Sequence, residues 1–471
     1  MPPLVLASRA GSLSFSIVVA VLVPACAPAS GTVRGREAPF PHLREAADGR
    51  PDAHDDRAPA TPLPDPASGA QVTLEGILAF ADQRSPVLLV ARSTRSRADA
   101  ARVAASPILP GNPELTVAAG RRSGRAGSAL ELELELLQPI AIAGERGLRH
   151  AAADRLGELT EADIEQIRWA VHCDVHAAFH AALVERERAR LAERVVAFQE
   201  DVLRVVERQI AAGETAPLSQ RLAQAEVAQA RQVLVAANQG FLASRLRLAQ
   251  LSGWPVARPP DPAGGVDAPR DPPDPIRLLE VARSQLPRLK VGRAVVREAA
   301  ARADLATRER WPRPSIGVQL HREGDVAGEG TYDTVMGVVS LTIPSFDTNQ
   351  GERARARADV TVGKAELEAA ERLLDGEIVQ ARGEVVAAAL RTRAYGTEIL
   401  PRFEENLTLL RRSFELGEID LLALSVGRER FLRIQSDALD AQLDYFTALA
   451  GLERVVGVDL WHDEHHEEPV R

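Results

Sequence analysis

The chain has 471 residues, of which 45% are hydrophobic, only 4% are aromatic and 26% are charged. This composition favours long helices and coiled coils over a globular core rich in aromatic side chains. The net charge is −9 and the charges are spread along helical stretches, which indicates no basic surface for nucleic acid. No P-loop, nucleophile elbow or zinc-protease motif is present, so the sequence does not indicate an enzyme.

Residues 1–25 have the pattern of an export signal. Arg9 precedes the apolar stretch LSFSIVVAVLV, which is too short to span a bilayer. Ala25 before Cys26 fits a lipoprotein signal, so we expect a mature chain that begins at a lipidated Cys26. Pro24 is unusual at that position, and the alternatives are ordinary signal cleavage or a coincidental cysteine. Residues 26–70 are rich in Pro, Ala, Asp and Gly, and we expect a disordered tether.

Membrane insertion, if it occurs, must use strands. No hydrophobic run after the signal is long enough for a transmembrane helix. Cys173 is the only other cysteine, so with Cys26 lipidated or removed the exported fold has no intrachain disulfide.

The chain contains two copies of one plan. Five landmarks recur in the same order at a nearly constant offset, which predicts a tandem duplication. The pairs are Pro86 and Pro287, Pro139 and Pro344, Gly144 and Gly351, Gly213 and Gly417, and Gly253 and Gly457. We place the first repeat at 71–254, a Pro/Asp/Gly linker at 255–275 and the second repeat at 276–460. The last residues, 461–471, form an acidic tail with histidines, which we expect to be solvated, although it could chelate cations weakly.

Each repeat contains a predicted β-hairpin, at about 113–138 and 315–343. In the stretch LELELEL, residues 130–136, leucines alternate strictly with Glu131, Glu133 and Glu135. A period of two is that of a strand with different surroundings on its two faces. Four such strands per chain are too few for a transmembrane barrel, which needs about eight, but three chains would supply twelve. We therefore expect leucines toward lipid and glutamates in a water-filled lumen; a half-buried sheet on a soluble protein is the alternative.

A very long helix follows each hairpin, over about 144–212 and 351–416. Each would span roughly 100 Å at ~1.5 Å per residue. Pro401 is expected to kink the second helix. Each helix then reverses at a glycine, Gly213 or Gly417, into a shorter helix at 216–251 or 419–456.

These features together resemble the outer-membrane efflux protein family typified by TolC, over about residues 71–460. The resemblance rests on the duplication, on QPIAIAGERGLRHAAA and LTIPSFDTNQGERARARA after the hairpins, and on the turns RQIAAGETAPLSQRLAQAE and RSFELGEIDLLALSVGRERFL. It implies a fold that is mainly α with a transmembrane β-barrel. The barrel would be a homotrimeric, 12-stranded outer-membrane barrel continued by a periplasmic helical tunnel. LPGNPELTVAAG and LELELLQPIAIAGERGLR look most like the branch that exports heavy-metal cations.

The resemblance also assigns roles to the helical turns. It implies that Ala212, Gly213, Glu214, Leu416, Gly417 and Glu418 contact a periplasmic adaptor, which connects the channel to an inner-membrane pump. Family members commonly carry acidic residues shortly after the second turn, as a constriction at the entrance. Here Ala423 and Val426 align with those positions, so Glu418 and Asp420 are the candidates for that constriction.

A histidine stripe is the one candidate for metal binding in the helices. His172, His176 and His180 recur every four residues, and imidazoles at that spacing can share a metal ion. Ordinary packing histidines are the alternative, because no ordered carboxylates accompany them. No cofactor is expected.

The sequence therefore predicts a passive outer-membrane duct of a tripartite efflux system, exporting metal cations from the periplasm. A drug, solvent or type I secretion channel shares most of the same landmarks. A periplasmic coiled-coil scaffold, whose hairpins pack on a partner instead of entering lipid, is a second class.

Overall fold

The structure is a computed structural model that describes residues 63–124, 127–213, 216–324 and 330–460. The chain divides into Met1–Pro39 and Phe40–Arg471, and every described residue belongs to the second unit. The predicted signal at 1–25, Cys26, most of the tether and the tail at 461–471 lie outside the described residues.

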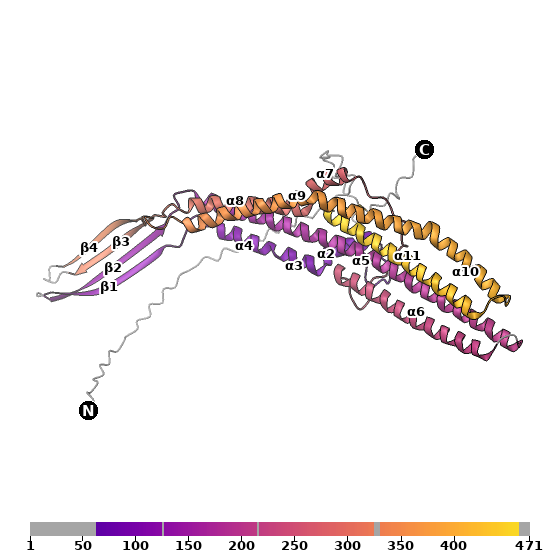
Figure 1. Cartoon of the computed structure of the whole chain (residues 1–471). Coiled ribbons are helices and arrows are strands. Elements are labelled where there is room, and N and C mark those ends of the chain that lie inside the picture. Colours follow the sequence, from indigo (N-terminus) through magenta and orange to yellow (C-terminus); the bar gives the residue numbers. More distant parts are fainter. Residues whose placement is uncertain (1–62, 125–126, 214–215, 325–329, 461–471) are drawn as a thin grey trace, which may run out of the picture. The chain divides into compact units, whose positions relative to one another are not determined.

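Four strands form one antiparallel sheet in the order β1-β2-β3-β4 (Figure 1). They are β1 Glu114–Gly124, β2 Gly127–Pro139, β3 Ser315–Gly324 and β4 Thr331–Ser340. The hairpins of the two repeats are joined through β2 and β3, where Leu134 lies opposite Leu320. The sequence predicted a last strand that continues to Ile343, but β4 ends at Ser340. Ser340 pairs with Ser315, the first residue of β3, so β3 has no residue left to pair with 341–343.

The first long helix, α5, runs without interruption over Glu145–Ala211 (67 residues), which corresponds to roughly 100 Å. It is preceded by three short helices and followed by a long one (Figure 1). These are α2 Leu74–Arg84, α3 Pro86–Ser93, α4 Arg95–Ala105 and α6 Pro217–Ser252. A helix of this length is held by packing along its sides, and α5 contacts α6, α8 and α11.

The second long helix is divided into three segments. After α7 Pro275–Gln285 and α8 Pro287–Arg308, the chain forms α9 Gln350–Ala394, a π-helical turn at Tyr395–Ile399, and α10 Leu400–Glu415, and then reverses into α11 Leu421–Val456. The kink predicted at Pro401 therefore takes the form of a π-helical turn directly before it. Proline has no N–H to donate and its ring crowds the preceding turn, and a wider turn accommodates both.

The two predicted repeats make equivalent contacts where their last helices end. Gly253 ends α6 and Gly457 ends α11, each with a left-handed φ, 78° and 85°. Gly253 packs on the backbone of Arg84, which comes two residues before Pro86, and Gly457 packs on Leu286, directly before Pro287. The end of each returning helix therefore meets the same corner, between the first two helices of its own repeat.

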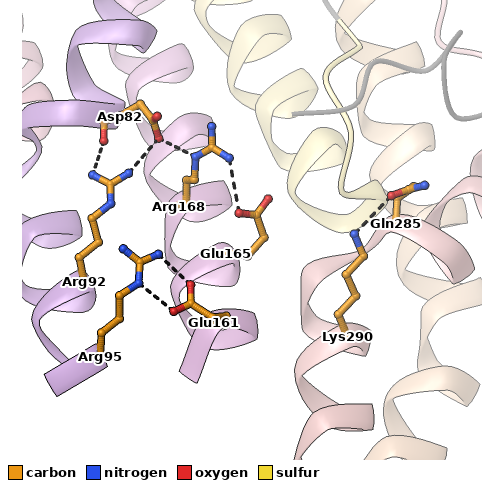
Figure 2. A network of polar contacts seen from close by, with 8 residues as sticks. All are labelled: Asp82, Arg92, Arg95, Glu161, Glu165, Arg168, Gln285 and Lys290. Carbon is orange, nitrogen blue, oxygen red and sulfur yellow. Dashed lines mark hydrogen bonds and ion pairs between the residues drawn. The ribbon is translucent and has the colours of Figure 1, made fainter. Parts of the chain in front are cut away.

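The short helices of the first repeat are fastened to α5 by a polar network (Figure 2). Arg168 of α5 is buried and its Nε lies 2.5 Å from a carboxylate oxygen of Asp82 in α2. Arg92 of α3 lies 3.5 Å from the same carboxylate, and Arg95 of α4 makes two hydrogen bonds to Glu161, at 2.7 and 2.8 Å. Buried or bidentate arginine–carboxylate pairs of this kind fix orientation as well as adding stability.

Arginines also hold the linker between the repeats against the helices. Arg245 of α6 donates to the carbonyl oxygens of Pro259 and Pro260, Arg186 of α5 donates to two further linker carbonyls, and Arg382 of α9 donates to Pro273. These guanidinium groups supply donors to backbone carbonyls that have no partner in a regular ladder.

Apolar packing is concentrated in the helices. One cluster joins α7, α8, α9 and α11, and a second joins α2, α3, α5 and α6. Each cluster belongs largely to one of the two predicted repeats. In the part of the chain that the structure covers, every helix is too short or too polar to span a bilayer.

Candidate functional site

The two faces of the sheet differ in chemistry. Glu131, Glu133 and Glu135 of β2 lie opposite Glu323, His321 and Gln319 of β3, in that order. Because side chains alternate along a strand, these six groups share one face. The three glutamates predicted for the lumen therefore lie on a continuous polar face that both repeats supply.

Polar contacts connect the strands across this face. The His321 Nε2 atom lies 3.4 Å from a carboxylate oxygen of Glu131 and 3.9 Å from one of Glu323. Gln319 donates a hydrogen bond to Glu133, and Arg122 of β1 forms an ion pair with Glu323. The face is therefore an array of charged and polar groups with an acidic excess, which suits a polar lumen.

The opposite face is apolar and exposed. Leu134 lies between Val117 of β1 and Leu320 of β3, and Leu320 in turn lies opposite Val335 of β4. Val335 is 68% exposed, and the apolar side chains of β3 are more exposed than Gln319 and His321 on its other face. Toward the loop end of the strands, the apolar face also carries the exposed ion pair of Arg322 and Asp333. Within the described chain no helix covers this face. In a half-buried sheet on a soluble protein the apolar face would be the covered one. Here the apolar face is the exposed one, which favours contact with lipid.

The two helical turns pack together. Val202 and Val206 of α5 form a buried cluster with Phe414 of α10 and Leu424 of α11, with Ala223 of α6 completing it. Gly213 and Gly417 take left-handed φ angles of 80° and 75°, as the reversals require. The residues assigned to adaptor contact therefore belong to one end of the helices, about 100 Å of α5 away from the sheet.

The residues assigned to this end are exposed wherever they are described. Ala212, Gly213, Leu416, Gly417 and Glu418 are all accessible, while Glu214 lies outside the described residues. Asp420, one candidate for the constriction, caps α11, since its carboxylate accepts a hydrogen bond from the Ala423 N–H at 2.8 Å. Capping accounts for the residue type at Asp420 by itself. Glu418 donates its backbone N–H to Ser413 O at 2.8 Å, and its exposed side chain remains the other candidate for the constriction.

A charged cluster near the turns was not predicted from the sequence. Arg428 of α11 lies 3.5 Å from a carboxylate oxygen of Glu226 in α6, and its side chain is almost covered. The guanidinium groups of Arg428 and Arg411 both lie near the ring of Phe198, at 5.9 and 5.7 Å from its centroid. Burial lowers the pKa of Arg428 below its ordinary value. Only the contact between repeats reveals this cluster, because its members are far apart in sequence.

The three histidines of the stripe lie inside the helical bundle. The His176 Nδ1 atom is 2.7 Å from Glu453 of α11, and both residues are buried. His180 stacks on the Phe446 ring at 3.9 Å, and His172 stacks on Trp169 and lies 3.6 Å from a carboxylate oxygen of Asp459. Within the described ranges, no group of three or more His, Cys, Asp or Glu side chains could hold a metal ion. The surroundings therefore match the packing alternative and give metal binding no support.

Comparison with known proteins agrees with this geometry. The family model for outer membrane efflux proteins matches residues 278–458, nearly the whole second repeat. The cobalt-zinc-cadmium resistance protein CzcC of Cupriavidus metallidurans is 23% identical over 347 residues, which cover 74% of this chain and 81% of that protein.

Two solved structures have the same fold. The outer-membrane channel OprN matches with a TM-score of 0.64 at 18% identity, covering 82% of this chain and 90% of that one. CusC, a protein that forms a transmembrane channel, matches with a TM-score of 0.63 at 14% identity, and the match covers 87% of this chain and all of that one.

The fold and the family match are those of outer-membrane efflux channels, which are passive ducts and not enzymes. The resemblance to outer-membrane efflux proteins predicted from the sequence is thereby confirmed: the family model matches the second predicted repeat, and CzcC is among the relatives of the chain. The agreement extends beyond the second repeat, because the structural matches cover both repeats.

Proposed function

We propose that three copies of the chain form a twelve-stranded barrel and a helical tunnel, which serve as the passive outer-membrane duct of a tripartite efflux system. The exposed apolar face of the sheet carries this proposal. Four strands leave β1 and β4 as unpaired edges within one chain, and open edges are not tolerated in hydrocarbon. Pairing of β4 with β1 of the next copy removes both edges and leaves the acidic face inside.

The proposed cargo is a divalent metal cation. The relative named for cobalt, zinc and cadmium resistance supports this class, and the acidic strand face carrying Glu131, Glu133 and Glu135 favours cation passage electrostatically. In a strain that lacks its own channel of this kind, the chain together with a cognate adaptor and pump should restore resistance to such cations. Restored resistance to organic drugs alone would contradict the proposed metal cargo but would still support an export duct.

Replacing Leu134 with Arg tests the assignment of faces. Leu134 lies at the centre of the apolar face, whereas the neighbouring Leu132 pairs with Arg322 near the polar margin. A charge at the bilayer midplane costs about 2–4 kcal/mol in each chain. We therefore expect Leu134→Arg to prevent assembly into heat-resistant trimers in the outer membrane, as measured by fractionation and native gels.

Glu133→Gln is the matched control, since it lies one residue away on the opposite face and keeps a hydrogen-bonding group near Gln319. It should assemble like the parent chain. Equal tolerance of both substitutions, or release of the parent chain by carbonate extraction, would favour the periplasmic scaffold instead.

We also propose that the turns bind the adaptor. Leu416 and Glu418 are exposed beside Gly417, at the end of the helices farthest from the sheet along α5. Charge reversal at Glu214 and Glu418 together should abolish export and adaptor co-purification, while the trimer remains in the outer membrane. Reversal of Glu368, an exposed carboxylate on the side of α9, should leave export unchanged. Export that survives the paired reversal would place the contact elsewhere.

A further inference from the structure

The four strand ends that join the helices lie along one edge of the sheet. Glu114 at the start of β1 pairs with Leu137, Pro139 pairs with Ser315, and Ser315 pairs with Ser340. Hydrogen bonds fasten the flanking segments: the Ile140 N–H donates to Pro314 O at 2.9 Å, and Gln138 Nε2 donates to Gly111 O at 2.9 Å. We call the segments 106–113, 140–150, 308–314 and 341–357 the junction.

The junction exposes large apolar side chains. Phe346 is 94% exposed, Ile343 76% and Ile108 75%, and Trp311 is about half exposed. These side chains flank the apolar face of the sheet, so the two surfaces are continuous along the chain. Trp311 combines an apolar ring with an N–H donor, which is the amphipathic character of an interfacial belt, and Phe346 adds apolar surface to the junction.

The junction is also basic, although the whole chain is acidic. Its segments contain eight arginines and four carboxylates, a net charge of +4 in a chain of net charge −9. Two of the arginines are ion-paired, Arg313 with Glu309 and Arg355 with Glu352. The Arg310 guanidinium lies 5.3 Å from the Trp311 ring centroid. The helices α5 and α9 both begin here, so their positive dipole ends add to the same potential.

We propose that the junction binds the phosphate groups of anionic phospholipids in the periplasmic leaflet of the outer membrane. The apolar side chains enter the interface, and the arginines, whose planar donors match phosphate geometry, contact the headgroups. The inference rests on the proposed placement of the chain in the outer membrane. It adds that anionic phospholipids of the periplasmic leaflet fix how deeply the chain sits in the bilayer.

The experiment uses the full chain purified in a neutral detergent, titrated with phosphatidylglycerol or phosphatidylcholine while thermal unfolding is followed. Phosphatidylglycerol should raise the unfolding midpoint, and phosphatidylcholine should raise it less. Because surface ion pairs are screened, the difference should shrink in high salt. Removal of three arginines, Arg146→Gln, Arg353→Gln and Arg357→Gln, should raise the half-effective phosphatidylglycerol concentration by about fivefold per charge.

The matched control removes three exposed arginines from the sides of the helices, Arg190→Gln, Arg372→Gln and Arg433→Gln. The control should respond to phosphatidylglycerol like the parent chain. Equal stabilisation by the two lipids, or a junction variant that responds like the control, would overturn the inference. Reconstitution into vesicles of either lipid distinguishes failure of the proposed function from failure of this inference. A chain that inserts into neither kind of vesicle contradicts the membrane duct. A chain that inserts into both without preference contradicts only the binding of anionic phospholipid.

Discussion

Replacing Gly457 or Gly253 with Ala should destabilise the chain far more than the same change at Gly417 or Gly213. All four glycines take a left-handed φ, between 75° and 85°, which costs a residue with a Cβ about 1–2 kcal/mol. The surroundings differ. A Cβ at Gly457 would lie 2.6 Å from the Leu286 Cα, and one at Gly253 would overlap the carbonyl group of Arg84.

A Cβ at Gly213 or Gly417 would meet nothing within 4 Å. The backbone overlap at Gly253 and Gly457 adds an overpacking cost of about 1–3 kcal/mol to the conformational one. The midpoint of thermal unfolding, followed by circular dichroism, should therefore fall in two separate steps: slightly for the turn variants and substantially for the corner variants. Similar losses at all four positions would show that conformation alone determines the cost.

The order of hairpin, long helix, turn and returning helix could be predicted from the sequence because its signals are local. The absence of proline from 144 to 212 and the reversal at Gly213 define α5. Strict alternation in residues 130–136 defines β2 and the chemistry of its two faces. Each signal needs only neighbours within a few residues, so one sequence is sufficient.

The contacts between repeats could not be predicted in this way. The histidine stripe is visible at a spacing of four residues, but its partner Glu453 lies 277 residues away on α11. Phe198 and the arginines around it are likewise brought together only by the packing of α5 against α10 and α11. The π-helical turn before Pro401 depends on how the helix accommodates the proline, whereas the sequence predicts only that some distortion occurs.

The buried pair of His176 and Glu453 joins the first repeat to the second. The Glu453 carboxylate accepts hydrogen bonds from His176 on α5, at 2.7 Å, and from the backbone N–H of Leu460, at 3.0 Å. Burial by itself would lower the pKa of His176, but the charge and hydrogen bond of Glu453, with a further contribution from Asp459, raise it above the ordinary value. Burial, with the charge of His176 beside it, lowers the pKa of His180 well below its ordinary value.

These two histidines should have opposite effects on the pH dependence of stability. A pKa raised in the folded state contributes stability that is fully present below the unfolded pKa, about 6.5, and is lost as the pH rises through the folded value. A histidine whose pKa is lowered destabilises the fold as the pH falls below about 6.5. In the parent chain the contributions of His176 and His180 therefore oppose each other across the mildly acidic range.

Glu453→Ala should be among the most destabilising single changes in the helices, costing about 3–5 kcal/mol, because it removes the carboxylate that binds the buried imidazole of His176 at 2.7 Å. His176→Gln should make stability fall more steeply between pH 7 and pH 5, since it removes the contribution of His176 that opposes the one of His180. His180→Gln should do the reverse and make the chain relatively more stable in acid. Unfolding midpoints measured at pH 5, 6, 7 and 8 test the signs, and Arg454, which forms an exposed ion pair with Asp174, supplies the control Arg454→Gln. If all three variants keep the pH profile of the parent chain, the buried pair does not titrate in this range.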